Sequence, residues 1–303
     1  MVDITHKSNS LRKAVASAIV SVSRLETIEA VKNKIVPKGD VFEFSRAAGL
    51  LAIKKTSDVI PDCHPLPVEY AAITYKVDGM NIIIHVEVQT IYKTGVEVEA
   101  MHGAAITALT IYDMLKPLDK GVEISTIRLE SKKGGKTDFR NEVTEKLRCA
   151  VMICSDSISA GARKDTSGKT IVEKLKQLNL SIGQYEIIPD EFSVIQEKIK
   201  QLSDQEYDLV LFSGGTGLSP RDVTPDAIAP LLDREIPGIM EAARNYGQQR
   251  TGFAMLSRGV AGFIKNTLVI TLPGSPAGAA ETMDALFPYV LHVFGVAKGF
   301  RHD

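Results

Sequence analysis

The sequence has no long apolar run, no surplus of either charge and few cysteines. No stretch approaches the ~18 apolar residues of a membrane-spanning helix, and the first residues lack a signal peptide's apolar core. With 36 basic and 37 acidic residues the formal charge is −1, so no general field attracts nucleic acid or a membrane surface. The three cysteines follow no disulfide pattern. These absences predict a soluble protein of the cytoplasm that binds neither nucleic acid nor membranes.

The length of 303 residues is sufficient for two domains, each with its own core. Residues 139–146 are polar and charged, and the pattern of apolar residues changes after them. We therefore place a domain boundary between residues 141 and 142, which gives domains of residues 1–141 and 142–303.

The first domain is predicted to have the element order β-α-β-β-α-β. Asp40 and Glu43 form a capping-box-like pair at a helix start, and Asp78-Gly79 predicts a type I′ turn between two strands. Strands are expected at 13–22, 68–77, 80–91 and 122–130, and helices at 26–35, 40–56 and 96–116. The helix at 40–56 is expected to bury Val41, Phe44, Ala48 and Leu51. This order predicts an α+β ferredoxin-like fold, with an antiparallel sheet and helices on one face.

Polar residues cluster at three places in this domain. Lys38 precedes a helix, Asp62-Cys63-His64 lies among prolines, and the long helix carries Glu97, Glu99, Asp113 and Lys116. Each cluster could also be an ordinary solvated surface, and no second ligand pair supports a metal site. Glu99 and Asp113 share a helix face but lie about 21 Å apart along the axis. One small ligand therefore cannot touch both on one helix, so either a site combines two subunits or one residue is structural.

The motifs of the first domain resemble those of cyclic pyranopterin monophosphate synthase, an enzyme of early molybdenum cofactor synthesis. They are Lys38–Phe42, Cys63–Leu66, Lys93–Ala100, Leu109–Met114 and Gly134-Gly135-Lys136. The resemblance implies a hexamer with active sites at dimer interfaces. It also implies conversion of 3′,8-cyclised dihydro-GTP into cyclic pyranopterin monophosphate and pyrophosphate.

The same resemblance implies roles for individual residues. Asp113 would be the principal catalytic residue, with Lys116 and Lys38 as acid–base candidates. We expect a lysine that is desolvated among other cations to have a lowered pKa. The substrate pocket would contain Asp62, Cys63, His64, Val98 and Glu99, with Arg12, Lys54 and Lys93 as triphosphate partners by charge. Val98 stands where the family most often has Met.

The second domain alternates strands with helices. Strands are expected at 147–154, 184–188, 207–212 and 267–272, and helices at 170–178, 193–202, 226–232, 237–246 and from 277 to about 296. This alternation predicts a doubly wound α/β domain with a mostly parallel sheet. Polar or Gly/Pro groups follow four strands, at Asp156, Asp190, Ser213–Gly217 and Pro273–Ser275. Ligands bind beyond the carboxyl ends of such strands, so one site is expected there.

The loop that starts at Ser213 suits a phosphate, because glycines let several backbone N–H groups turn toward one anion. Arg221 supplies a fork for phosphate oxygens and Asp222 a carboxylate for a divalent cation. A Walker lysine, a dinucleotide-binding glycine motif and a Ser/His/Asp nucleophile set are lacking. The pattern therefore favours phosphoryl or nucleotidyl transfer by positioning and charge neutralisation.

Helix starts offer a second explanation for part of this pattern. Thr224 is expected to be the N-cap of a helix. Asp226 and Asp156 could also be capping residues rather than ligand contacts.

The motifs of the second domain resemble those of the molybdopterin adenylyltransferases. They are Ser155-Asp156, Asp165–Gly168, Ile188–Glu191, Gly214–Gly217, Arg221–Asp226, Ser257-Arg258 and Leu272–Pro276. The resemblance implies a trimer that uses Mg²⁺ and ATP to adenylylate molybdopterin phosphate. Asp190 and Asp222 would serve catalysis and Mg²⁺ binding. The pterin phosphate and nucleotide would contact Ser155, Asp156, Gly214, Gly215, Thr216, Gly217, Arg258 and Ser275.

Three functional hypotheses follow. The first is a bifunctional enzyme of molybdenum cofactor synthesis with two independent sites. The second retains the synthase and makes the second domain a molybdopterin-binding module without adenylyl transfer. The third is an unrelated nucleotide-binding regulator. In the pathway that these resemblances imply, sulfur insertion by a separate synthase lies between the two reactions, so direct channelling is not expected. Shared threefold symmetry favours a homo-oligomer, with a hexamer as the natural closed assembly.

Overall fold

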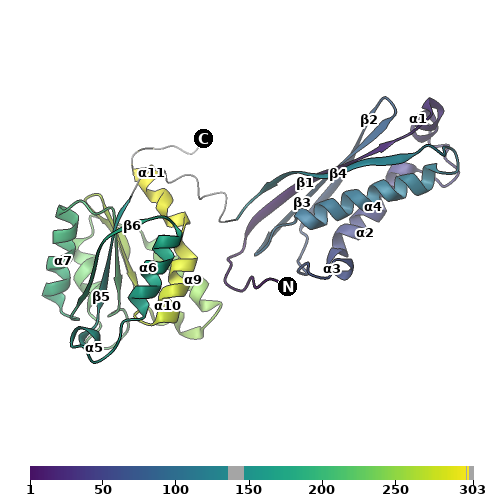
Figure 1. The fold of residues 1–303 in the computed structure, drawn as a ribbon. Helices are drawn as coiled ribbons and strands as arrows, with labels where there is room; N and C mark the ends of the chain where they lie inside the picture. Colours follow the sequence, from purple (N-terminus) through teal and green to yellow (C-terminus); the bar gives the residue numbers. More distant parts are fainter. Residues whose placement is uncertain (136–146, 298, 300–303) are drawn as a thin grey trace. The chain divides into compact units, whose positions relative to one another are not determined.

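A computed structural model describes residues 1–135, 147–297 and 299 of the chain. It divides into two compact units, Met1–Asp138 and Phe139–Asp303 (Figure 1), and each is described by itself. The predicted boundary between residues 141 and 142, the polar segment at 139–146 and Lys136 lie outside the described residues.

The first unit has the predicted ferredoxin-like order. Its elements are β1 (Ser10–Ser21), α1 (Leu25–Lys32), α2 (Val41–Lys54), α3 (Thr56–Val59), β2 (Tyr70–Asp78), β3 (Asn81–Tyr92), α4 (Glu97–Leu115) and β4 (Glu123–Lys133). The strands are ordered β2-β3-β1-β4, and every neighbouring pair is antiparallel. Helices α2 and α4 cover one face of this sheet (Figure 1).

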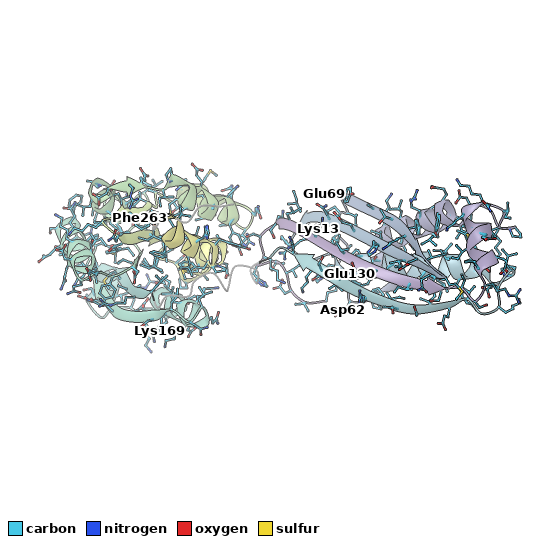
Figure 2. All side chains as sticks on the ribbon, turned by 90° about the horizontal axis from the view of Figure 1, so that it is seen from above. Lys13, Asp62, Glu69, Glu130, Lys169 and Phe263 are labelled. Atoms are coloured by element: carbon cyan, nitrogen blue, oxygen red, sulfur yellow. The ribbon has the colours of Figure 1, made fainter. Side chains whose placement is uncertain are left out.

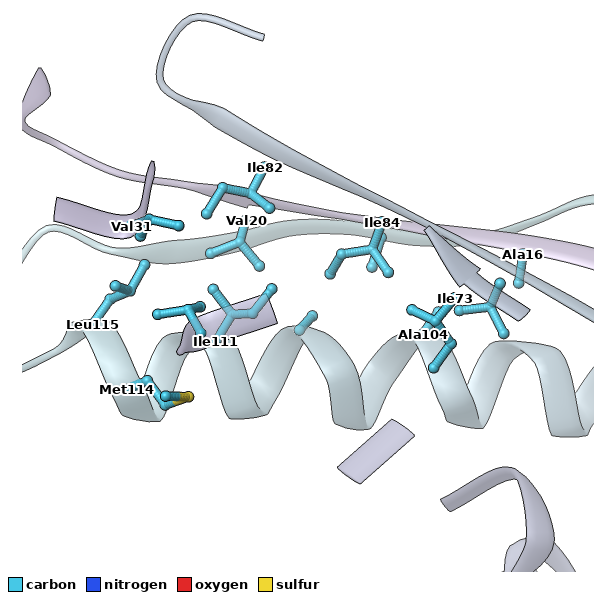
Figure 3. Close-up of a cluster of buried hydrophobic side chains, with 14 of the residues drawn as sticks. Ala16, Val20, Val31, Ile73, Ile82, Ile84, Ala104, Ile111, Met114 and Leu115 are labelled. Carbon is cyan, nitrogen blue, oxygen red and sulfur yellow. The ribbon is translucent and has the colours of Figure 1, made fainter. Parts of the chain in front are cut away.

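The core of the first unit lies between the sheet and α4. Strand β3 alternates as predicted, with Ile82, Ile84, Val86 and Val88 fully buried. Figure 3 shows strands of the sheet above α4, with small and large apolar side chains between the sheet and the helix. The alanines Ala100, Ala104 and Ala108 are fully buried on α4. Because these side chains are short, the helix can lie close to the sheet.

The predicted buried face of α2 was partly wrong. Val41 is buried, but the side chains of Phe44 and Leu51 are 62% and 61% exposed. The buried positions are Val41, Ser45, Gly49, Ala52 and Ile53. Small residues face α4 because the two helices approach closely: a Cβ on Gly49 would lie 2.1 Å from the Thr107 hydroxyl oxygen. Hydrophobicity does not mark a face built from serine and glycine, whereas the large side chains remain on the outer surface.

Local capping and turn predictions had different outcomes. Asp40 is the N-cap of α2, where its carboxylate accepts from the backbone N–H groups of Phe42 at 3.1 Å and Glu43 at 3.2 Å. The hairpin turn is shifted by one residue, because Asp78 pairs with Asn81 and leaves Gly79-Met80 as the loop. Gly79 has φ +59° and Met80 does not have positive φ. This is the pattern of a type II′ turn rather than the predicted type I′.

The second unit contains a six-stranded sheet of order β6-β5-β7-β10-β9-β8. Strands β6, β5, β7 and β10 are parallel, as predicted, and β9 and β8 add antiparallel strands at one edge. Its strands are β5 (Arg148–Cys154), β6 (Ser181–Ile188), β7 (Leu209–Ser213), β8 (Arg234–Glu235), β9 (Ala261–Ile264) and β10 (Thr267–Leu272). The short strands β8 and β9 were not predicted, because two to four residues carry too little periodicity.

The helices of the second unit cover both faces of its sheet. They are α5 (Asp156–Ser159), α6 (Ser167–Gln177), α7 (Phe192–Asp204), α8 (Thr224–Ile228), η2 (Ala229–Leu231), α9 (Pro237–Gln248), η3 (Gly252–Leu256), α10 (Pro276–Leu286), η4 (Tyr289–His292) and α11 (Val293–Ala297). The predicted closing helix is therefore three segments. Alternate residues of β5 enter different cores: Val151 packs on the α6, α9 and α10 side, and Met152 on the α7 side (Figure 1). No helix in the described ranges is both long and apolar enough to cross a membrane.

The contact between α2 and α4 can be tested at Gly49. Gly49→Ala places a methyl group against Thr107 and Ile73. We expect a loss of about 1–2 kcal/mol in stability, because the packing strain exceeds the gain in helix propensity. Hydrogen exchange of α2 and α4 amides across a urea series measures it. Gly238→Ala in α9 is the control, since nothing lies within 4 Å of its Cβ position. Unchanged protection in Gly49→Ala would contradict the close contact.

Candidate functional sites

The predicted site residues of the first unit fall into two groups at opposite ends of α4. This helix is continuous from Glu97 to Leu115, so the predicted distance of about 21 Å between Glu99 and Asp113 applies. A Cβ on Gly103 of α4 would lie 2.6 Å from Cγ1 of Ile53 in α2. Gly49, earlier in α2 than Ile53, contacts Thr107, which is later in α4 than Gly103. The two helices are therefore antiparallel, and the start of α2 lies at the end of α4.

The carboxyl end of α4 carries the lysine–aspartate cluster, which consists of Lys38, Asp113 and Lys116. The Nζ atom of Lys38 lies 2.6 Å from Oδ2 of Asp113 and donates to its backbone carbonyl at 2.8 Å. Lys116 Nζ lies 2.8 Å from Oδ1 of the same carboxylate. Hydrogen bonds from Lys116 and then Lys38 lower the pKa of Asp113 to about 2. The structure thus brings the three predicted catalytic residues together.

The pKa lowering expected for a lysine desolvated among cations is not found at Lys116 in the single chain. The hydrogen bond and charge of Asp113 raise the pKa of Lys116. The carboxylate stabilises the ammonium, and the side chain is exposed rather than desolvated among cations. A lowered lysine pKa would require additional cations close to the cluster.

The amino end of α4 carries a buried carboxyl group. The side chain of Glu99 is 3% exposed, and its Oε1 accepts from Sγ of Cys63 at 3.2 Å. Its Oε2 is buried without a hydrogen-bond partner in the described part of the chain. Burial raises the pKa of Glu99, and it raises the pKa of the Cys63 thiol to about 12. An unsatisfied buried oxygen is suited to a polar group of a ligand.

The other predicted pocket residues of this unit occupy neighbouring segments. Arg12 donates from Nε to the carbonyl of Tyr92 at 3.3 Å and from Nη2 to that of Lys93 at 3.4 Å. Asp62 lies 2.7 Å from the amino group of Met1, at the same end of the unit as Lys13 (Figure 2). Nε2 of His64 lies 2.8 Å from the Val2 carbonyl oxygen. The side chains of Lys54, at the end of α2, and Val98, on α4, are exposed.

In the second unit five of the predicted site residues line one cavity of about 390 Å³, the strand-end pocket, whereas Asp156, Thr216, Gly217, Asp222 and Arg258 are not among its lining residues. Its lining includes Ser155, Asp190, Gly214, Gly215 and Ser275. Parallel strands end at a common edge, which explains why residues far apart in sequence meet here.

Serines at this pocket begin two of the helices. Ser155 caps α5 by accepting from the Ile158 N–H at 3.4 Å, and Ser275 caps α10 by accepting from the Gly278 N–H at 3.2 Å. Asp156 is therefore not the cap of the helix after the first strand. Its Oδ1 instead accepts from the Asp190 N–H at 3.1 Å.

The glycine loop leaves no room for side chains at its first two positions. Gly214 has φ +109°, and a Cβ there would lie 2.1 Å from the carbonyl oxygen of Cys154. A Cβ on Gly215, at φ +59°, would lie 2.4 Å from Oγ1 of Thr224 and 2.8 Å from Oδ1 of Asp190. The loop therefore presents backbone to the pocket, as the sequence predicts for phosphate binding.

Asp190 has the properties of a cation ligand. Its Oδ1 is buried and accepts no hydrogen bond from the described residues. Burial raises the pKa of Asp190, and the charges of Asp156 and Asp222 add to this effect. Asp222 accepts from the Ser219 N–H at 2.9 Å through Oδ2. Within the described ranges no three His, Cys, Asp or Glu side chains form a metal cluster, so a cation here would need ligand oxygens from a phosphate.

The two motif arginines are engaged with protein groups. Arg221 donates from Nε to Asp156 Oδ2 at 3.1 Å and from Nη2 to the same oxygen. Arg258 Nη1 contacts both oxygens of Asp226 at 2.9 and 3.0 Å. Its Nε donates to the Gly217 carbonyl at 2.8 Å. Arg258 therefore connects the end of the glycine loop to α8. A role of its side chain in phosphate binding remains a prediction.

Two further capping expectations require correction. The N-cap of α8 is Val223, and the Thr224 hydroxyl is buried with no hydrogen-bond partner among the residues described. Asp226 lies in the first turn of α8 and pairs with Arg258 instead of capping the helix. Thr216, also predicted to bind ligand, is buried, and its carbonyl accepts from the Arg258 N–H at 3.1 Å.

The sequence interpretation missed several pocket residues. Arg163 and Lys164 line the strand-end pocket beside Thr166 and Ser167. Their position between two recognised motifs was the available signal. A second cavity of about 310 Å³ shares Ser275 with the first. It is lined mainly by α9, η3 and α10, and contains Arg244, Phe253 and Ser257.

The lysine–aspartate cluster gives a pH prediction. The pKa of Asp113 is lowered to about 2 from 3.8, so its stabilising pairing exists above about pH 4 and disappears as pH falls through 2. Lys116→Met should raise the Asp113 pKa toward 3.8, because the largest stabilising hydrogen bond is removed. Carboxyl-carbon NMR of labelled aspartate measures it. Lys120→Met removes a nearby exposed charge as a control, and equal titration in both variants would refute the pairing.

Two family models match the chain, one in each unit. Residues 1–135 match the MoaC family, and residues 150–292 match a family described as a probable molybdopterin binding domain. A molybdenum cofactor biosynthesis bifunctional protein of Chlorobaculum tepidum is 39% identical over 302 residues, covering 100% of this chain and 96% of that protein. A protein of the same name from Synechococcus elongatus is 34% identical, covering 100% of this chain and 98% of that protein.

The first unit is also similar to single-domain proteins. A cyclic pyranopterin monophosphate synthase of Pelobacter propionicus is 46% identical over 145 residues, covering 47% of this chain and 90% of that protein. With identity above 30% along its whole length, the chain belongs to the family of bifunctional molybdenum cofactor biosynthesis proteins, with a MoaC domain followed by a probable molybdopterin-binding domain.

Proposed function

We propose that the chain catalyses two reactions of molybdenum cofactor synthesis. The first unit converts 3′,8-cyclised dihydro-GTP into cyclic pyranopterin monophosphate and pyrophosphate. The second unit adenylylates molybdopterin with ATP. The observation that carries the first activity is the Lys38–Asp113–Lys116 cluster. For the second it is the pocket that joins a glycine loop to Oδ1 of Asp190, a buried oxygen without a hydrogen-bond partner among the described residues.

In the first reaction the two lysines transfer protons to and from the substrate. Asp113 contacts both ammonium groups within 2.8 Å, so it fixes their positions and balances their charge. Glu99 and Cys63, at the other end of α4, bind polar groups of the substrate with His64 and Asp62. Arg12, Lys54 and Lys93 provide positive charge for its triphosphate.

In the second reaction a phosphate oxygen of molybdopterin attacks the α-phosphorus of ATP, and pyrophosphate leaves. The Gly215 N–H binds a phosphate oxygen, since the Gly214 N–H already donates to the Leu272 carbonyl at 3.1 Å. The helix start at Ser275 lies on the same pocket. The adjacent cavity that shares Ser275 accommodates the pterin, which gives one cavity for each substrate.

Mg²⁺ fits the second site because Asp190 offers a buried oxygen without a partner among the described residues. Asp190 and Asp222 would hold the ion, which neutralises phosphate charge when bound. The protein's own residues orient the nucleotide through the glycine loop and exclude water through the buried walls beneath it.

We also propose a cytoplasmic homo-oligomer. The cysteines Cys63, Cys149 and Cys154 are all free, in keeping with a reducing compartment. The exposed Phe44 and Leu51 give α2 an apolar outer surface suited to a second copy. A trimer or hexamer would allow the amino end of α4 in one copy to meet the carboxyl end in another.

Separate assays test the two activities in one chain. Asp113→Asn should reduce synthase activity about 100-fold or more, because the two lysines lose their common counter-charge. Asp190→Asn should reduce adenylylation by a similar factor, since it removes the buried anionic oxygen. Each variant should retain the other activity, which makes each the control for the other. Bound molybdopterin without adenylylated product in the wild type would instead make the second unit a binding module.

Mixed oligomers test whether each synthase site combines two subunits. Neither Glu99→Gln nor Asp113→Asn alone should be active. If each site takes Glu99 from one subunit and Asp113 from the other, random co-assembly of both variants restores about a quarter of wild-type activity. Half of the dimers then contain one subunit of each variant, and one of the two sites in each such dimer holds both native residues. No recovery after co-expression, with mixed oligomers verified by mass spectrometry, would place each site within one chain.

A further inference from the structure

Phosphate binding in the strand-end pocket requires positive charge that the motif arginines do not supply. Arg221 contacts the carboxylate of Asp156 through two of its nitrogens. Arg258 contacts the carboxylate of Asp226 and the carbonyls of Gly217 and Asp222. Each guanidinium already has a carboxylate counter-ion, so its charge is largely balanced within the protein. Another source of charge is needed for a polyphosphate.

Arg163 and Lys164 occupy the required position. Among the described residues that line the strand-end pocket, these two are the cations and Asp190 is the anion. Neither forms an ion pair with any residue that the structure describes. Both side chains are exposed, so a ligand entering the pocket can reach them.

The turn that carries these cations is anchored at both ends. On one side the N–H groups of Ala162 and Arg163 donate to the Ser157 carbonyl at 2.9 and 3.1 Å. On the other side Asp165 is buried and accepts from the Gly168 N–H at 2.9 Å and from the Tyr185 hydroxyl. A short turn fixed in this way places two charges at the pocket with little loss of backbone entropy on binding.

We propose that Arg163 and Lys164 bind the β- and γ-phosphates of a nucleoside triphosphate and the pyrophosphate that leaves. This inference rests on the proposed adenylyl transfer. The glycine loop donates neutral N–H groups, which suit one phosphate, whereas a triphosphate carries several more negative charges. Two adjacent cations beside the loop match those charges. The pair thereby selects triphosphate over monophosphate and stabilises charge on the leaving group.

Steady-state kinetics and calorimetry of the full chain test the assignment. Arg163→Gln and Lys164→Gln should each raise the KM for ATP and the Kd of inorganic pyrophosphate roughly tenfold. The KM for molybdopterin should not change. Arg163→Lys and Lys164→Arg, which retain the charge, should recover most of the affinity. Lys169→Gln in α6 (Figure 2) is the matched control, because Lys169 is exposed but does not line the pocket.

The outcomes separate this inference from the proposed function. If the wild type adenylylates molybdopterin and both glutamine variants retain the ATP and pyrophosphate affinities of Lys169→Gln, the assignment is wrong and adenylyl transfer stands. A rise in the KM for molybdopterin instead of ATP also overturns it, since the cations then bind the pterin phosphate. A wild type without turnover whose pyrophosphate binding still weakens in both variants supports the cation assignment and removes the proposed activity. A wild type that binds neither ATP nor pyrophosphate removes both.

Discussion

Both candidate sites depend on glycines at which any side chain would overlap atoms of a neighbouring segment. In the first unit Gly49 and Gly103 let α2 pack directly against α4, which brings Lys38 to Asp113. In the second unit Gly214 passes over the Cys154 carbonyl, and Gly215 leaves space for the carboxylate of Asp190. A methyl group at these positions would separate the elements that carry the functional side chains.

The first unit distributes its chemistry along one rigid helix. Glu99 is buried and has a raised pKa at one end, whereas Asp113 is exposed and has a lowered pKa at the other. A helix of this length keeps the two carboxyl groups too far apart for a single substrate. The helix therefore separates the two groups of predicted site residues, and contact between copies of the chain is a physical requirement if both groups act on one molecule.

The second unit uses its charged residues for two different purposes. Arg258 and Asp226 close the glycine loop, and Arg221 and Asp156 connect the loops that follow different strands. These pairs hold the walls of the pocket in place. Among the described residues that line the pocket, the charged ones are then Asp190, an anion, and Arg163 and Lys164, two cations. The pocket thus holds charges of both signs beside neutral backbone donors, which is suited to a metal–polyphosphate complex.

The sequence by itself determined the order of the strands in the first unit, the order of the parallel strands in the second, and which residues follow those strands. The alternation around Ile84 and the Asp40 cap are local patterns, and the structure confirms both. Only the tertiary structure decided that Phe44 lies outside and that Arg258 is paired with Asp226. Periodicity and capping depend on neighbours in the chain. The contact face of a helix and the partner of a charge depend on residues distant in sequence, which a local pattern does not encode.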